Sequence, residues 1–159
     1  MKIGYFGDGP WAHKAFDKIV NDSSIEIKFI TVRYDKQDEE LIKRSEKYNI
    51  PIELSENINS EDFIERMRQY NVDLFVSMSF NQIFRTEMIN LPQYKTINCH
   101  AGKLPFYRGR NILNWALIND EKEFGITVHY LDEGIDTGDI ILQEIFPITD
   151  EDNYGSLLA

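Results

Sequence analysis

Two kinds of apolar pattern alternate along residues 1–100, and this alternation constrains the fold more than any other feature of the sequence. Short, mostly apolar runs typical of strands occupy residues 2–6, 25–32, 73–78 and 96–99, with a short extended piece at 51–54. Between them, apolar residues recur at helical spacing after Pro10, over 38–48, after the N-cap candidate Ser60 and around 86–90. Such a chain is expected to form an α/β fold, a mostly parallel sheet flanked by helices. Ligands of such sheets bind beyond the carboxyl ends of the strands.

The regular alternation ends after residue 100. The sequence there predicts a loop at 101–110, a helix at 112–118 and two strands at 125–131 and 139–145. The acidic residues 150–154 resemble the start of a helix, but too few residues follow for that helix to be stable alone. We interpret residues 1–159 as one catalytic domain, because this length supplies a single core, and we expect the domain to continue past residue 159.

Charge and cysteine content narrow the classes of partner. The 27 acidic and 17 basic residues give a formal net charge of −10, which repels nucleic acids and anionic membranes as main partners. The single cysteine allows no internal disulfide, and the spacing of the Cys and His residues predicts no metal site. Residues 1–7 are too short and too polar for a signal peptide, and no apolar run is long enough to span a bilayer. We therefore expect a cytoplasmic protein.

The segment Asn98-Cys99-His100 ends a predicted strand. Because alternate residues of a strand share a face, Asn98 and His100 project together and Cys99 points the other way, which favours a structural cysteine. An amide donor beside an imidazole suits acyl transfer, since the amide can stabilise an oxyanion and the imidazole can move protons. Spacing alone equally fits a capped turn with a structural histidine. His129, inside an apolar strand, is expected to pack in the core.

Several motifs occur in one order over residues 96–143. They are Asn98-x-His100, the Leu-Pro-x-Tyr-Arg-Gly loop at 104–109, Asn-Trp-Ala at 114–116 and a Gly-x-Thr-x-His run at 125–129 that leads into Gly-Ile-Asp-Thr-Gly-Asp at 134–139. Together they resemble the folate-dependent formyltransferases, and residues 77–83 resemble the segment beside that family's folate pocket. The resemblance implies the family's Rossmann-like formyltransferase fold.

The resemblance also implies a reaction and its residues. A formyl group would pass from 10-formyltetrahydrofolate to an amine through a tetrahedral intermediate, and no metal would take part. The catalytic trio would be Asn98, His100 and Asp136. Asn98 and protonated His100 would stabilise the oxyanion, and His100 or Asp136 would relay the amine proton.

Binding residues are expected around this trio. We assign the folate to Met78, Ser79, Phe80, Leu131, Asp132, Gly134 and Ile135. We assign the acceptor substrate to Gly9, His13, Lys103, Tyr107, Arg108 and Arg110. The residues alone leave open a plain surface role for His13 and a structural role for Arg108.

The acceptor is the least constrained part of the prediction. Residues 107–115 look most like the sugar N-formyltransferases, and the acidity of the chain counts against tRNA, so we expect a nucleotide-linked amino sugar. The alternatives are a methionyl-tRNA or other small-amine formyltransferase, a 10-formyltetrahydrofolate hydrolase, and a non-catalytic folate- or nucleotide-binding module. A homodimer is possible.

Overall fold

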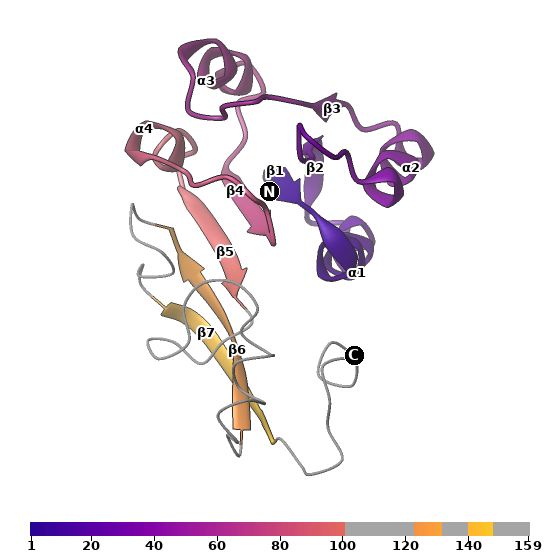
Figure 1. Cartoon of the computed structure of the whole chain (residues 1–159), viewed down its shortest axis with the longest axis vertical. Coiled ribbons are helices and arrows are strands. Elements are labelled where there is room, and N and C mark those ends of the chain that lie inside the picture. The colour runs from indigo at the N-terminus through magenta and orange to yellow at the C-terminus, as the bar shows by residue number, and fades with distance from the viewer. Residues whose placement is uncertain (101–122, 132–139, 148–159) are drawn as a thin grey trace.

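The computed structural model describes residues 1–100, 123–131 and 140–147 (Figure 1). Its strands are β1 (Lys2–Gly7), β2 (Glu26–Thr31), β3 (Ile52–Glu53), β4 (Leu74–Met78), β5 (Thr96–His100), β6 (Glu123–Tyr130) and β7 (Ile140–Pro147). Within the described residues they form one sheet in the order β3-β2-β1-β4-β5-β6-β7. Strands β1 to β5 pair in parallel, whereas β6 and β7 pair antiparallel. The predicted α/β fold with a mostly parallel sheet is confirmed.

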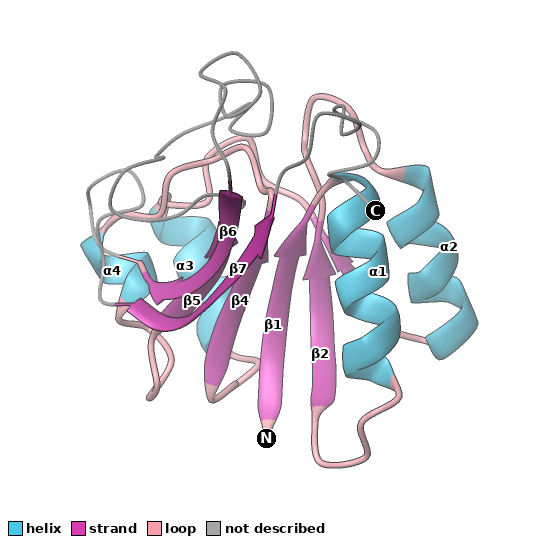
Figure 2. Cartoon of the chain, turned by 90° about the horizontal axis from the view of Figure 1, so that it is seen from below, coloured by secondary structure: helices cyan, strands magenta, loops and turns pink. Residues whose placement is uncertain are grey.

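Four helices are described, and they cover both faces of the sheet. They are α1 (Gly9–Val20), α2 (Glu39–Tyr48), α3 (Glu61–Arg68) and α4 (Thr86–Ile89). Helices α1 and α2 lie on one face, and α3 and α4 lie on the other (Figure 2). Pro10 stands in the first turn of α1, and the Ser60 side chain caps α3 by accepting a hydrogen bond from the Phe63 N–H, as predicted.

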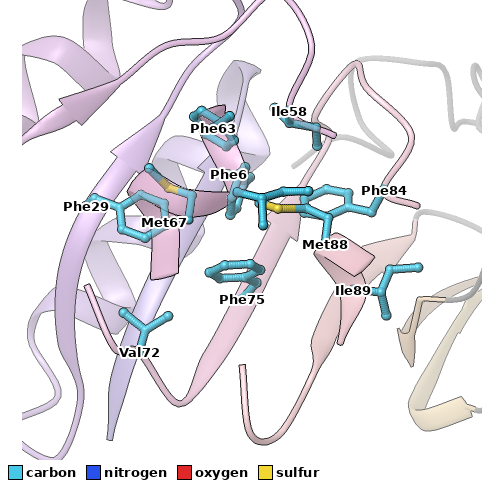
Figure 3. Packing of buried hydrophobic residues seen from close by; sticks show 11 residues of the cluster. Phe6, Phe29, Ile58, Phe63, Met67, Val72, Phe75, Phe84, Met88 and Ile89 are labelled. Carbon is cyan, nitrogen blue, oxygen red and sulfur yellow. The ribbon is translucent and has the colours of Figure 1, made fainter. Parts of the chain in front are cut away.

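An aromatic cluster fills the face under α3 and α4. Phe6 lies at its centre and meets Phe29, Phe75 and Phe84 edge-on, with ring centroids 5.6, 5.1 and 4.9 Å apart (Figure 3). Gly4 gives this cluster its room, because a Cβ there would lie 2.3 Å from Cζ of Phe29. The cluster holds the middle strands of the sheet against α3 and α4.

The remaining differences from the sequence expectations are small. The extended piece predicted at 51–54 is a strand of only two residues, β3, and the predicted strands at 125–131 and 139–145 form the antiparallel pair of β6 and β7. The loop expected at 101–110, the helix at 112–118 and the helix start at 150–154 lie outside the described residues. Among the residues described, no helix has the length and apolarity to cross a membrane, and no cluster of His, Cys, Asp and Glu could hold a metal ion.

Candidate active site

The strand order reverses at β1, and this reversal marks the expected ligand site. From β1 the chain builds outward through β2 to β3 on one side, and β4 and β5 continue on the other side. In doubly wound sheets the ligand crevice opens at such a switch point, beyond the carboxyl ends of the strands. Here the Asp8 N–H donates to the carbonyl oxygen of Met78 over 3.1 Å, which ties the ends of β1 and β4 together. The predicted binding residues Gly9, Met78 and Ser79 therefore lie at this edge.

Asn98 stands near the end of β5 at the same edge. In register it pairs with Ser77 on β4 and with His129 on β6. Cys99 packs against the hydrophobic cluster under α1 and α2, so it points away from Asn98 as predicted. Burial raises the pKa of the Cys99 thiol to about 11, which suits a structural role better than a nucleophilic one.

The other two members of the predicted trio are placed only in part. His100 is the last residue of β5, and its backbone pairs with Thr127 on β6. Asp136 lies outside the described residues. The assignment of His100 and Asp136 to catalysis stays a prediction.

His129 is fully buried, as predicted, and it also contacts Asn98. Its Nδ1 lies 2.9 Å from the carbonyl oxygen of Tyr130, and its Nε2 lies 3.5 Å from Nδ2 of Asn98. This contact could not be predicted from the sequence, because it depends on the register between β5 and an antiparallel neighbour 31 positions away.

A carboxylate that the sequence analysis missed organises the loop after β1. Asp38 accepts a hydrogen bond from the Gly9 N–H over 2.8 Å, and its two oxygens lie 2.7 and 2.8 Å from Nε2 of His13. Asp38 also caps α2 by accepting from the Leu41 N–H. Burial alone would raise the pKa of Asp38, but the hydrogen bonds from Gly9, His13 and Leu41 outweigh it and lower that pKa.

These contacts change the expected roles of Gly9 and His13, the two predicted substrate residues at this loop. Gly9 and His13 do come together, and Asp38 bonds both of them. The Asp38 carboxylate thus occupies the backbone N–H that a substrate anion could otherwise use at this loop. The signal that could have revealed it is the position of Asp38 just before a predicted helix, where an acidic residue is a strong N-cap.

Asp8 and Arg33 lie at the same edge of the sheet, shortly after the ends of β1 and β2. Burial, followed by repulsion from Asp38, raises the pKa of Asp8, while Nη1 of Arg33 stands 3.9 Å from its carboxylate. Arg33 makes a closer pair with the exposed Asp35, at 2.7 Å. Within the described residues the loop after β1 is therefore mainly acidic, and any positive charge for a phosphate must come chiefly from elsewhere.

The predicted folate segment shows a strained residue and an apolar surface. Ser79 directly follows β4 with φ of +58°, a left-handed conformation that is uncommon for residues other than glycine and that often marks functional sites. Phe80 and Leu131 are half-buried, and both pack against the aromatic cluster. The Leu131 N–H donates to the carbonyl oxygen of Thr96 over 2.9 Å, so the end of β6 is fixed beside the start of β5.

The other predicted binding residues lie outside the described part of the chain. For the folate they are Asp132, Gly134 and Ile135, and for the acceptor they are Lys103, Tyr107, Arg108 and Arg110. Their roles stay predictions.

Solved structures that superimpose on this chain include formyltransferases. A phosphoribosylglycinamide formyltransferase from Anaplasma phagocytophilum superimposes with a TM-score of 0.85 at 26% identity, over 99% of this chain and 77% of that one. A sugar 3N-formyltransferase, WlaRD, solved in the presence of dTDP and 5-N-formyl-THF, superimposes with a TM-score of 0.67 at 28% identity, over 93% of this chain and 52% of that one.

Sequence relatives lead to the same family. Methionyl-tRNA formyltransferase from Halothermothrix orenii is 33% identical over 99% of this chain and 52% of its own length. The enzyme of that name from Pelotomaculum thermopropionicum is 40% identical over 69% of this chain and 35% of its own length. The chain thus spans about half or less of these relatives. The family model described as formyl transferase matches residues 1–159, and the chain therefore belongs to the formyl transferase family.

Proposed function

We propose that the protein transfers a formyl group from 10-formyltetrahydrofolate to an amine. The observation that carries the proposal is the position of Asn98, near the carboxyl end of β5 and one strand from the switch point, in a chain that matches the formyl transferase model throughout. The folate supplies a formyl carbon that an amine can attack. The chain supplies the groups that bind, orient and stabilise.

The described residues fit the folate at two points. Phe80, shortly after β4, offers a half-buried apolar side chain on which an aromatic ring system can pack, and Leu131 packs against the same aromatic cluster. Ser79 has a left-handed backbone and is exposed. A planar, largely apolar ligand with a few polar atoms is well matched by such a surface. Met78, Asp132, Gly134 and Ile135 complete the proposed folate site.

Asn98 carries the electrostatic part of the proposed mechanism. As the amine attacks, negative charge develops on the formyl oxygen, and a side-chain N–H of Asn98 donates to it. One donor of this kind contributes about 10²- to 10³-fold to the rate in other acyl-transfer enzymes. His100 or Asp136 relays the proton from the attacking amine to the folate nitrogen.

For the acceptor we propose a nucleotide-linked amino sugar, bound chiefly by Lys103, Tyr107, Arg108 and Arg110, because Asp38 already accepts a hydrogen bond from the Gly9 N–H and contacts His13. The likeness of residues 107–115 to the sugar N-formyltransferases and the net charge of −10 support it. Asp8, directly after β1, and Asp38, the N-cap of α2, place carboxylates at this edge of the sheet that would also repel a polyanion. A second candidate is methionyl-tRNA, because the curated relatives described above carry that name.

The test is an acceptor screen. The purified protein is incubated with 10-formyltetrahydrofolate and, in turn, nucleoside-diphosphate amino sugars, methionyl-tRNA and glycinamide ribonucleotide, and formylated product is measured by mass spectrometry. We expect product with an amino sugar. If methionyl-tRNA is the one acceptor that yields product, the proposed acceptor is wrong but the proposed formyl transfer holds.

Two variants sharpen the screen. Asn98→Ala should lower kcat by about 10²- to 10³-fold. Asn21→Ala, an exposed asparagine at the other end of α1, should leave kcat unchanged. Donor cleavage without any amine would identify a hydrolase, and donor binding without turnover would identify a binding module; either result refutes the proposed transfer.

A further inference from the structure

We infer that His129 is a positioning residue for Asn98. In this assignment the imidazole accepts a hydrogen bond from one N–H of the Asn98 side chain and so determines the direction in which the NH2 group of that carboxamide points. The inference rests on the proposed function, because it concerns the group that would meet the formyl oxygen.

The register of the sheet places the two residues side by side. Phe6 on β1, Ser77 on β4, Asn98 on β5 and His129 on β6 are successive partners across four strands. Directly opposite residues of an antiparallel pair have neighbouring side chains on one face. The pairing of β6 with β7 shifts register between Val128 and His129, an irregularity of the kind that re-aims a side chain beside a functional site.

The tautomer of His129 follows from its other contact. Nδ1 lies 2.9 Å from the Tyr130 carbonyl oxygen, and a carbonyl oxygen can only accept, so Nδ1 carries the hydrogen. In the neutral ring Nε2 is then a bare acceptor. Nδ2 of Asn98 can only donate, and it lies 3.5 Å from Nε2. This long contact has the right polarity, and catalytic hydrogen bonds often tighten when substrate binds.

Burial makes this arrangement specific. His129 is 0% exposed, so bulk water does not reach the ring to replace Asn98 as its partner. With the carboxamide held this way, one N–H of Nδ2 faces His129. The second N–H of the same nitrogen is the donor that the proposed mechanism assigns to the formyl oxygen. A flipped amide would present its oxygen to Nε2 and lose that attraction.

The tautomer can be measured without any substrate. In the ¹⁵N-labelled protein, long-range ¹H–¹⁵N correlation spectra should show His129 with a protonated Nδ1 and a bare Nε2. The Asn98 side-chain amide signals should shift in His129→Met but much less in His129→Gln, whose side-chain oxygen can still accept. A protonated Nε2, or Asn98 signals that do not respond to His129→Met, overturns the inference.

Kinetics test the consequence for catalysis. His129→Met should lower kcat by about 10- to 100-fold, while the KM for the formyl donor changes little. The loss of a residue that orients a metal ligand has an effect of similar size in metalloenzymes. His129→Gln should restore most of kcat. Wild-type kcat in His129→Met would overturn the inference while leaving the proposed function intact, whereas a wild-type protein without formyl transfer would overturn the proposed function itself. If His129→Met does not fold, His129→Gln and the wild-type tautomer decide the question.

Discussion

The carboxylate of Asp38 receives three hydrogen bonds from separate parts of the chain, so Asp38→Ala removes them together. It caps α2 through the Leu41 N–H, holds the loop after β1 through the Gly9 N–H and bonds His13 on α1. Loss of an N-cap costs about 1 kcal/mol. Each hydrogen bond to a charged acceptor contributes about 1.5 kcal/mol or more when it is shielded from water. Because the Asp38 side chain is only 9% exposed, we expect a total loss of about 4 kcal/mol in the free energy of unfolding.

Urea unfolding, followed by circular dichroism and extrapolated to water, measures this loss. Asp38→Asn should lose less, because asparagine is also a good N-cap but offers only one acceptor oxygen. Asp35→Ala is the matched control: it removes an ion pair with Arg33, but the Asp35 side chain is 60% exposed, so we expect a much smaller change in the free energy of unfolding than in Asp38→Ala. Equal losses in Asp38→Ala and Asp35→Ala would refute the assigned role of Asp38.

The stabilisation that Asp38 provides should depend on pH. Hydrogen bonds lower the pKa of Asp38 in the folded protein below its ordinary value. A carboxyl group of this kind stabilises the fold above its unfolded pKa, and the contribution is lost as pH falls through the folded pKa. The difference in unfolding free energy between wild type and Asp38→Ala should therefore be full at pH 7 and shrink below about pH 4. A difference that stays constant down to pH 3 would contradict this account.

Two further predictions concern the interior. Gly4→Ala should lower the free energy of unfolding by about 1–3 kcal/mol, because the new Cβ would meet the buried Phe29 ring. Adding Phe29→Leu to the Gly4→Ala protein should recover part of that loss. If the losses of the two single variants are fully additive in urea unfolding, the predicted clash is contradicted. Cys99, whose thiol pKa is raised to about 11, should react with iodoacetamide at pH 8 more than about tenfold slower in the native protein than in urea. Equal native and unfolded rates would contradict the raised thiol pKa of the half-buried Cys99.

Local patterns predicted most of the elements and the fold class. The apolar runs at 2–6 and 73–78, the Ser60 cap and Pro10 in the first turn of α1 all appear in the structure close to their expected positions. Each depends on residues within a few positions of one another. The prediction that Cys99 points away from Asn98 was confirmed for the same reason, because the alternation of side chains along a strand is a local property.

Contacts between segments far apart in the sequence could not be predicted from local patterns. His129 was expected in the core, and only the register of β5 with β6 revealed that it also meets Asn98. Asp38 lies 25 positions from His13, and their contact required the turn of the chain through β2. By itself the sequence determined the order of elements, the parallel sheet and the family motifs. The tertiary structure alone decided which side chains share the edge of the sheet, because strand register and helix packing bring together groups whose separation along the chain has no fixed period.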